Sequence, residues 1–150
     1  PLWQGRFLQM RNASALAQFA DHRSYYYAGK QVDKAVHLGY DLASVAQAKI
    51  EAANDGEVVW ADYLCIYGLC VVIDHGLGLQ SLYAHMSQLD VQTGDMVTRG
   101  QEMGRSGATG MAGGDHLHFG VFVSGIAVQP LEWWDKNWLK NNIDSKLGAL

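Results

Sequence analysis

The chain has 150 residues, of which 49% are apolar and 17% charged, so it is long enough to bury one sizeable core and is not a disordered segment. Its formal net charge is -4 and its basic residues are scattered, which argues against a protein held to nucleic acid by a basic surface. Its apolar stretches are all too short for a membrane-spanning helix.

The first segment, residues 1–33, combines a helical pattern with a lead-in to a strand. Between residues 7 and 22, apolar positions such as Met10, Ala13 and Leu16 recur three to four apart, which predicts a short N-terminal helix. Residues 25–30 indicate a short strand that ends in a turn. Since the chain opens with Pro1 and shows no basic-then-apolar leader, we expect a mature or truncated fragment of a longer protein.

Short strands and glycine turns dominate the central segment, residues 34–133. Residues 56–61 are strand-like, and the runs 69–75 and 79–85, separated by a glycine-containing turn, predict a hairpin. Glycines punctuate residues 91–110, and a further strand is expected from His116 to Val123. The tail, residues 134–150, has the pattern of an amphipathic helix packed on the core by its tryptophans. We expect all three segments to form a single domain.

Histidine and aspartate residues supply the candidate chemistry. His37 and Asp41 are four apart, a spacing that places both on one face, and imidazole and carboxylate are ordinary zinc ligands. In a strand, His116 and His118 share one face, so they could serve one metal, divide metal binding and proton transfer, or simply face solvent. His85 ends a strand-like run and gains meaning only if it meets the other two motifs in space.

The two remaining histidines point to structural roles. We expect His75 to hold a turn and His22 to lie on the surface or in a loop.

Together, these motifs resemble the M23 family of zinc metallopeptidases, the lysostaphin-like or LytM-type domains that cut peptide bonds in peptidoglycan. The resemblance rests on His37-x-x-x-Asp41, Val71–Gly76, Leu82–Ser87 and His116-Leu117-His118-Phe119, in that order, and it covers about residues 34–133. It implies a mainly β fold: an antiparallel, partly open sheet with a short N-terminal helix and a C-terminal helix.

The resemblance also implies a role for each residue. His37, Asp41 and His118 would be the three ligands of one Zn²⁺ ion, while His85 and His116 would be catalytic residues beside it. Three protein ligands leave a fourth position for water, as a catalytic zinc site requires. Histidine would take the place of the glutamate base of other metalloproteases, because no His-Glu-x-x-His motif is present.

Several residues keep more than one interpretation. Asp115 stands where the family commonly has proline, and it either influences His116 or is a solvated turn residue. Arg23 either holds a substrate carboxylate or, as we favour, pairs with Asp21. Cys65 and Cys70 are predicted to form a local disulfide across a hairpin tip, the alternative being two thiols.

The sequence therefore predicts a zinc-dependent endopeptidase that hydrolyses peptide bonds in peptidoglycan stem peptides or cross-links, outside the cytoplasm. Segments 23–36, 61–70 and 105–115 are the expected walls of its groove, with tyrosines facing the peptide. The alternative is a catalytically silent M23-like regulator that activates a separate cell-wall amidase. A third interpretation is a wall-binding module with a structural metal. The expected partners are a peptidoglycan peptide and a regulatory segment or protein outside these residues.

Overall fold

Short antiparallel strands make up most of the regular secondary structure in the computed structural model, which describes residues 1–148. The strands are β1 (Ser14–Ala17), β2 (His22–Tyr27), β3 (Lys30–Val36), β4 (Tyr40–Ala43), β5 (Lys49–Glu51), β6 (Gly56–Tyr63), β7 (Leu69–Asp74), β8 (Leu79–Leu89), β9 (Met96–Val97), β10 (Glu102–Ser106), β11 (Leu117–Val123) and β12 (Ile126–Val128). The helical segments are the 3₁₀ turn η1 (Cys65–Tyr67), α1 (Pro130–Trp134), α2 (Lys136–Leu139), the π-helical turn η2 (Lys140–Asp144) and α3 (Ser145–Leu147).

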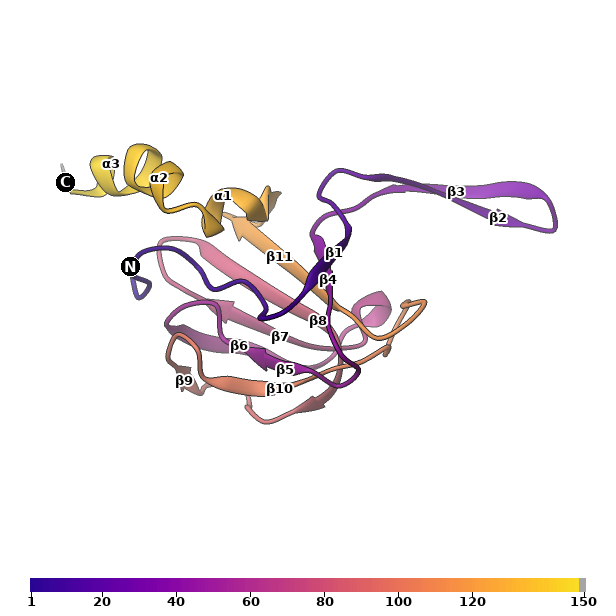
Figure 1. The fold of residues 1–150 in the computed structure, drawn as a ribbon, viewed down its shortest axis with the longest axis horizontal. Coiled ribbons are helices and arrows are strands. Elements are labelled where there is room, and N and C mark those ends of the chain that lie inside the picture. The colour runs from indigo at the N-terminus through magenta and orange to yellow at the C-terminus, as the bar shows by residue number, and fades with distance from the viewer. Residues whose placement is uncertain (149–150) are drawn as a thin grey trace.

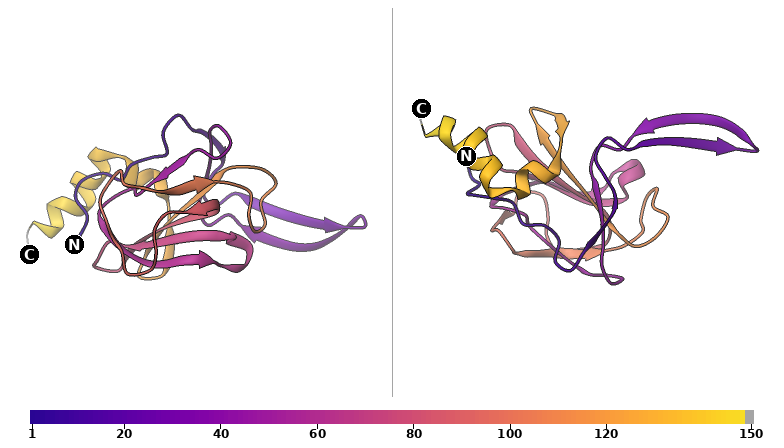
Figure 2. Two further views of the ribbon diagram at one scale, coloured as in Figure 1. Left: turned by 90° about the horizontal axis from the view of Figure 1, so that it is seen from below. Right: turned by 45° about the horizontal axis from the view of Figure 1, so that its top comes forward.

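A ten-stranded sheet forms the body of the molecule, and β2 and β3 form a separate two-stranded sheet. The order β1-β4-β11-β8-β7-β6-β9 places β4, β11 and β8 side by side. Figure 1 shows the β2–β3 hairpin extending away from the body, with α1–α3 and both chain ends on the opposite side, and the views in Figure 2 agree. The mainly β, antiparallel, open fold with a C-terminal helical segment is thus confirmed.

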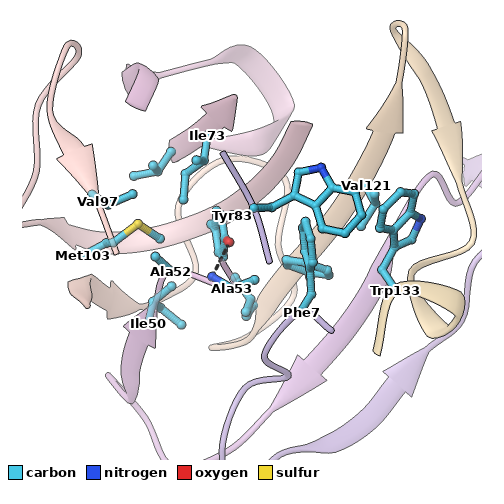
Figure 3. Close-up of a cluster of buried hydrophobic side chains, with 14 of the residues drawn as sticks. Phe7, Ile50, Ala52, Ala53, Ile73, Tyr83, Val97, Met103, Val121 and Trp133 are labelled. Atoms are coloured by element: carbon cyan, nitrogen blue, oxygen red, sulfur yellow. Dashed lines mark hydrogen bonds between the residues drawn. The ribbon is translucent and has the colours of Figure 1, made fainter. Parts of the chain in front are cut away.

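Buried apolar side chains from the strands and from both terminal segments form one large core cluster (Figure 3). Tyr83 on β8 lies at its centre, and its hydroxyl accepts a hydrogen bond of 2.7 Å from the backbone N–H of Ala53. Phe7 and Trp133 pack together at one end, with ring centroids 5.5 Å apart. Trp134, Trp138 and Ile143 of the C-terminal segment also pack against this cluster, so the tail is joined to the core largely through aromatic residues.

The N-terminal helix predicted over residues 7–22 is wrong. Ser14–Ala17 instead form β1, which pairs with β4 through Ser14↔Ala43 and Ala15↔Leu42. Asn12 and Ala20 have φ angles of 52° and 68°, a left-handed conformation that a right-handed helix cannot contain. The apolar spacing arises because single residues of an irregular segment reach the core, and pairing to β4 outweighs the local helix preference.

The predicted hairpin is confirmed as β7 and β8, joined by a turn in which Gly76, Leu77 and Gly78 all have positive φ. The predicted disulfide is wrong: Cys65 and Cys70 are both free thiols. Cys65 lies in η1, outside the strand ladder, whereas Cys70 on β7 pairs with Asp62 of β6, so the two are not cross-strand partners. Burial raises the pKa of the Cys70 thiol to about 11.

Among residues 1–148, we find no helix with both the length and the apolar character needed to cross a membrane.

Candidate metal centre

Strand register brings the histidine motifs together. On β11, His118 lies directly opposite Asp41 of β4 on one side and Ala84 of β8 on the other. His37 precedes β4, and its backbone is held to the base of the β2–β3 hairpin, because its N–H donates to the carbonyl of Asp21 at 2.9 Å. Three segments distant in the sequence therefore meet at one point of the sheet.

His37, Asp41 and His118 form a compact group of donor atoms, called here the HDH cluster. The Nε2 atom of His37 and the Nδ1 atom of His118 each lie 2.9 Å from Oδ1 of Asp41, and they are 3.0 Å from one another. All three residues are buried.

Hydrogen bonding fixes which nitrogen of His37 faces the cluster. Its Nδ1–H donates to the carbonyl of Gln18 at 2.7 Å, and since a carbonyl only accepts, Nε2 of the neutral ring keeps its lone pair. That lone pair points at a carboxylate oxygen and a second imidazole nitrogen. These three atoms repel one another unless a proton or a cation lies between them.

The cluster fits a zinc ion in donor type and in size. Two imidazole nitrogens and one carboxylate oxygen are an ordinary catalytic zinc set. A triangle with edges of 2.9–3.0 Å allows one point to lie about 2.1 Å from every corner, which is the length of Zn–N and Zn–O bonds. A bond through Nδ1 of His118 leaves the ring proton on Nε2, which is buried without a hydrogen-bond partner among the described residues.

His85 and His116 flank the HDH cluster, with their ring centroids 4.8 Å apart. His116 brings its Nε2 atom to 3.7 Å from Oδ1 of Asp41, and its Nδ1–H donates to the carbonyl of Gly114. His85 donates from Nδ1–H to the carbonyl of Thr109 at 2.8 Å. In both neutral rings, Nε2 therefore remains free to accept a proton.

A β-bulge turns His85 toward this site. Its φ angle is 62°, a left-handed value rare for a side chain with a Cβ atom, and it lies where the β7–β8 register shifts. Bulges commonly redirect one side chain out of the regular alternation. The Thr109 side chain supports this geometry, since its hydroxyl accepts from Leu69 N–H and donates to the Met86 carbonyl.

Burial and hydrogen bonding set the charge states at the site. Burial lowers the pKa of His85 and of His118, so both rings are held neutral near pH 7. Burial of Asp41 acts to raise its pKa, but the close contacts with His118, His37 and Arg23 outweigh burial and hold the pKa well below the usual range. Neutral imidazoles and an ionised carboxylate are the forms that bind a metal.

An open groove of about 220 Å³ runs over the cluster. Residues from all three predicted wall segments line it: Arg23, Tyr25, Ala35, Val36, Ile66, Tyr67 and Met111, with His37, Leu38, His85 and His118 from the site itself. Tyr25 and Tyr67 face the groove, whereas Tyr26 and Tyr27 are exposed and do not line it. Only part of the expected tyrosine wall is thus present.

Two polar side chains near the site have partners that the sequence did not reveal. Arg23 does not pair with Asp21; its Nη2 atom donates to Oδ2 of Asp41 at 2.7 Å. Asp115 neither contacts the His116 ring nor lies free in solvent, because its carboxylate accepts from the Ser106 hydroxyl and the Gln47 N–H. Both contacts join segments that only the folded chain brings together.

The other two histidines lie outside the site. His75 is fully buried, with Nδ1–H donating to the Asp55 carbonyl and Nε2 2.7 Å from the Ser81 hydroxyl. Its backbone N–H closes the β7–β8 turn on Leu79, in keeping with the predicted structural role. His22 is exposed on β2.

Residues 35–130 match the family model described as Peptidase family M23, and the chain therefore belongs to this family. The murein hydrolase activator EnvC of Escherichia coli (strain K12) is 39% identical over 95 residues, 63% of this chain. The peptidoglycan DD-endopeptidase ShyA of Vibrio cholerae is 37% identical over 98 residues, 65% of this chain. The matched part is 23% of the length of each relative, so this chain corresponds to a minor portion of them.

A solved structure supports the same conclusion. The crystal structure of a zinc-containing peptidase from Vibrio cholerae superimposes with a TM-score of 0.73 at 27% sequence identity, covering 86% of this chain and 40% of that one.

Proposed function

We propose that the chain is a zinc-dependent endopeptidase that hydrolyses peptide bonds in peptidoglycan stem peptides or cross-links, and that it acts outside the cytoplasm, where this polymer lies. The observation that carries the proposal is the HDH cluster, whose three acceptor atoms converge within 3.0 Å, with two further imidazoles beside it. Membership of peptidase family M23 and the likeness to ShyA support the substrate class.

In this proposal His37, Asp41 and His118 hold the ion. Bound zinc supplies a coordinated water with a pKa near 7 and polarises the scissile carbonyl. The remaining requirement is a group that takes a proton from the water and returns one to the leaving amine.

His85 and His116 meet that requirement. Each ring donates from Nδ1 to a backbone carbonyl, which fixes its orientation and leaves Nε2 facing the site as the acceptor. Burial holds the pKa of His85 below its ordinary value, so that ring is unprotonated at neutral pH and its Nε2 atom is available as the acceptor. We assign both residues to proton transfer and to stabilising charge on the carbonyl oxygen. A chain of peptide enters along the groove between Tyr25 and Tyr67.

A second candidate function follows from the likeness to EnvC, which is named as an activator of a murein hydrolase. In that case the same groove would bind a segment of a separate enzyme, and the histidines would move no proton. The two candidates differ in whether the purified chain releases peptides from the wall polymer by itself.

The experiment is a digest of purified peptidoglycan with the Zn²⁺-loaded chain, analysed by mass spectrometry for newly freed amino and carboxyl ends. We expect peptide products from the wild type, none after chelator treatment, and none from His118→Ala, which removes a ligand. His85→Ala and His116→Ala are expected to keep bound zinc and lose the products.

The matched control is His22→Ala, because this exposed histidine lies outside the groove lining. A wild-type chain with one bound zinc and no products, which nevertheless stimulates a cell-wall amidase, would favour the activator instead. Products that persist in His85→Ala and His116→Ala would refute the roles assigned to these two residues.

A further inference from the structure

Among the described residues of the β2–β3 hairpin, Arg23 is the one whose charged side chain contacts the HDH cluster. Its Nη2 atom donates to Oδ2 of Asp41 at 2.7 Å, while Oδ1 of the same carboxylate faces the two imidazoles. The Asp41 side chain is 7% exposed and that of Arg23 is 40% exposed. The guanidinium thus covers one oxygen of a carboxylate whose other oxygen is turned inward.

A carboxylate can bind a metal through one oxygen or through both, and the choice changes the coordination number. With Oδ2 engaged by a charged donor, only Oδ1 of Asp41 remains available to an ion in the cluster. We propose that Arg23 is a positioning residue, which holds Asp41 in one-oxygen ligation and so keeps a coordination position open for water. This inference rests on the proposed zinc function.

The hairpin is built to deliver this contact. Arg23 lies opposite Ala35 across the β2–β3 ladder, and both line the groove, so a small neighbour leaves room for the long side chain. At the base of the hairpin, Ala20 N–H donates to the His37 carbonyl, and His37 N–H donates to the Asp21 carbonyl. One short segment of backbone therefore fixes His37 and, through Arg23, the carboxylate beside it.

The alternative is that the ion pair only fastens the hairpin to the body. A partly exposed pair contributes little to stability, whereas groups that orient a metal ligand alter metal affinity about 10–100-fold when removed. The two roles therefore differ in metal binding, and they can be separated without measuring catalysis.

The test uses the 150-residue chain and two probes. Zn²⁺ affinity is measured by competition with a chromophoric chelator, and the visible absorption of the Co²⁺-substituted chain reports coordination number, because four-coordinate Co²⁺ absorbs more strongly than five-coordinate Co²⁺. Arg23→Met removes the donor at similar length, and Arg23→Lys restores a charged donor. Arg11→Met is the matched control, since Arg11 makes a 2.8 Å pair with Glu51 away from the groove.

We expect Arg23→Met to bind Zn²⁺ about 10–100-fold more weakly and to shift the Co²⁺ spectrum toward five-coordination. Arg23→Lys should return most of both properties, because the structure shows a single hydrogen bond from one guanidinium nitrogen. Arg11→Met should match the wild type.

Wild-type affinity in Arg23→Met, or an unchanged Co²⁺ spectrum, would overturn the inference. A lysine variant that behaves like the methionine variant would also count against it. Failure of the proposed function is a separate result: a wild-type chain that binds Zn²⁺ with the four-coordinate Co²⁺ spectrum, yet releases no peptides from peptidoglycan, would leave the role of Arg23 intact.

Discussion

Gly39 lies between two residues of the HDH cluster, and its missing side chain is what makes room for the His118 ring. A Cβ atom added at Gly39 would lie 2.6 Å from both Cε1 and Nε2 of His118, and 2.7 Å from the carbonyl oxygen of Phe119. The φ angle of Gly39 is not in the left-handed region, so alanine is acceptable to the local backbone. The substitution Gly39→Ala therefore tests the close packing of this backbone against the His118 ring and the Phe119 carbonyl.

The size of the effect follows from these distances. Ordinary contact with a Cβ atom begins near 3.4 Å, so the ring must move by about 0.8 Å. The Tyr67 ring already lies beside it, with ring centroids 5.5 Å apart. Zinc–ligand distances tolerate about ±0.2 Å. Moreover, the Nε2 atom of His118 has no hydrogen-bond partner among residues 1–148, so within them packing alone sets the position of the ring on that side.

We expect Gly39→Ala to weaken Zn²⁺ binding by about 10–100-fold, as for other changes that misplace a ligand. We also expect overpacking to lower the free energy of unfolding of the metal-free chain by about 1–3 kcal/mol. The assays are chelator competition for Zn²⁺ and urea unfolding of the metal-free chain. Gly113→Ala is the control, because nothing lies within 4 Å of a Cβ atom there. A Gly39→Ala chain with wild-type zinc affinity would refute the assignment of His118 as a sterically positioned ligand.

Three further predictions concern the buried polar network and the His85 support. Burial lowers the pKa of His75, so the unfolded state binds a proton on this ring more readily than the folded state does, and the free energy of unfolding falls as pH drops below 6.5. In urea unfolding from pH 7.5 to 5.5, the free energy of unfolding of His75→Gln should fall less steeply than that of the wild type, by at most about 1.4 kcal/mol per pH unit. Tyr83→Phe removes the acceptor for the Ala53 N–H and should cost about 1–3 kcal/mol, read by urea unfolding. Thr109→Val removes the partner of the Leu69 N–H and should cost a similar amount while lowering turnover with zinc content unchanged, read by kcat and metal analysis. A pH-independent difference for His75→Gln, or wild-type stability in either of the other two variants, would contradict these assignments.

The sequence predicted the elements whose signals are local. The apolar runs that became β7 and β8 flank a turn in which Gly76 and Gly78 adopt positive φ, and glycines between two such runs are enough to predict a hairpin. The motifs around His37, Asp41 and His118 also indicated a common site, because their order matched a known arrangement. Their contact at 2.9–3.0 Å, however, depends on β4 and β11 pairing in one register, with His118 opposite Asp41.

Other features depended on tertiary contacts and could not be predicted. The alanines and leucine before residue 18 have helical spacing, yet β1 forms because β4 offers a strand edge to pair with. Arg23 was expected to pair with its neighbour Asp21, but Asp21 accepts from the Gln18 N–H and Arg23 reaches across to Asp41. The left-handed backbone of His85 has no signature in the residues around it.

The charge arrangement of the site bears on the choice between an enzyme and a silent regulator. Gathering an ionised carboxylate and two lone-pair-bearing nitrogens into a buried triangle costs free energy, because each group gives up water for neighbours that repel it. Arg23 offsets the charge of Asp41 through Oδ2, but it leaves Oδ1 and the imidazole nitrogens facing one another. A cation in the triangle removes this cost, so Zn²⁺ should stabilise the folded chain by a margin that grows with its free concentration. A binding surface alone needs no such arrangement, whereas the proposed proton transfer would use the imidazoles of His85 and His116, each oriented by a backbone carbonyl. These features favour the proposed endopeptidase over a silent regulator.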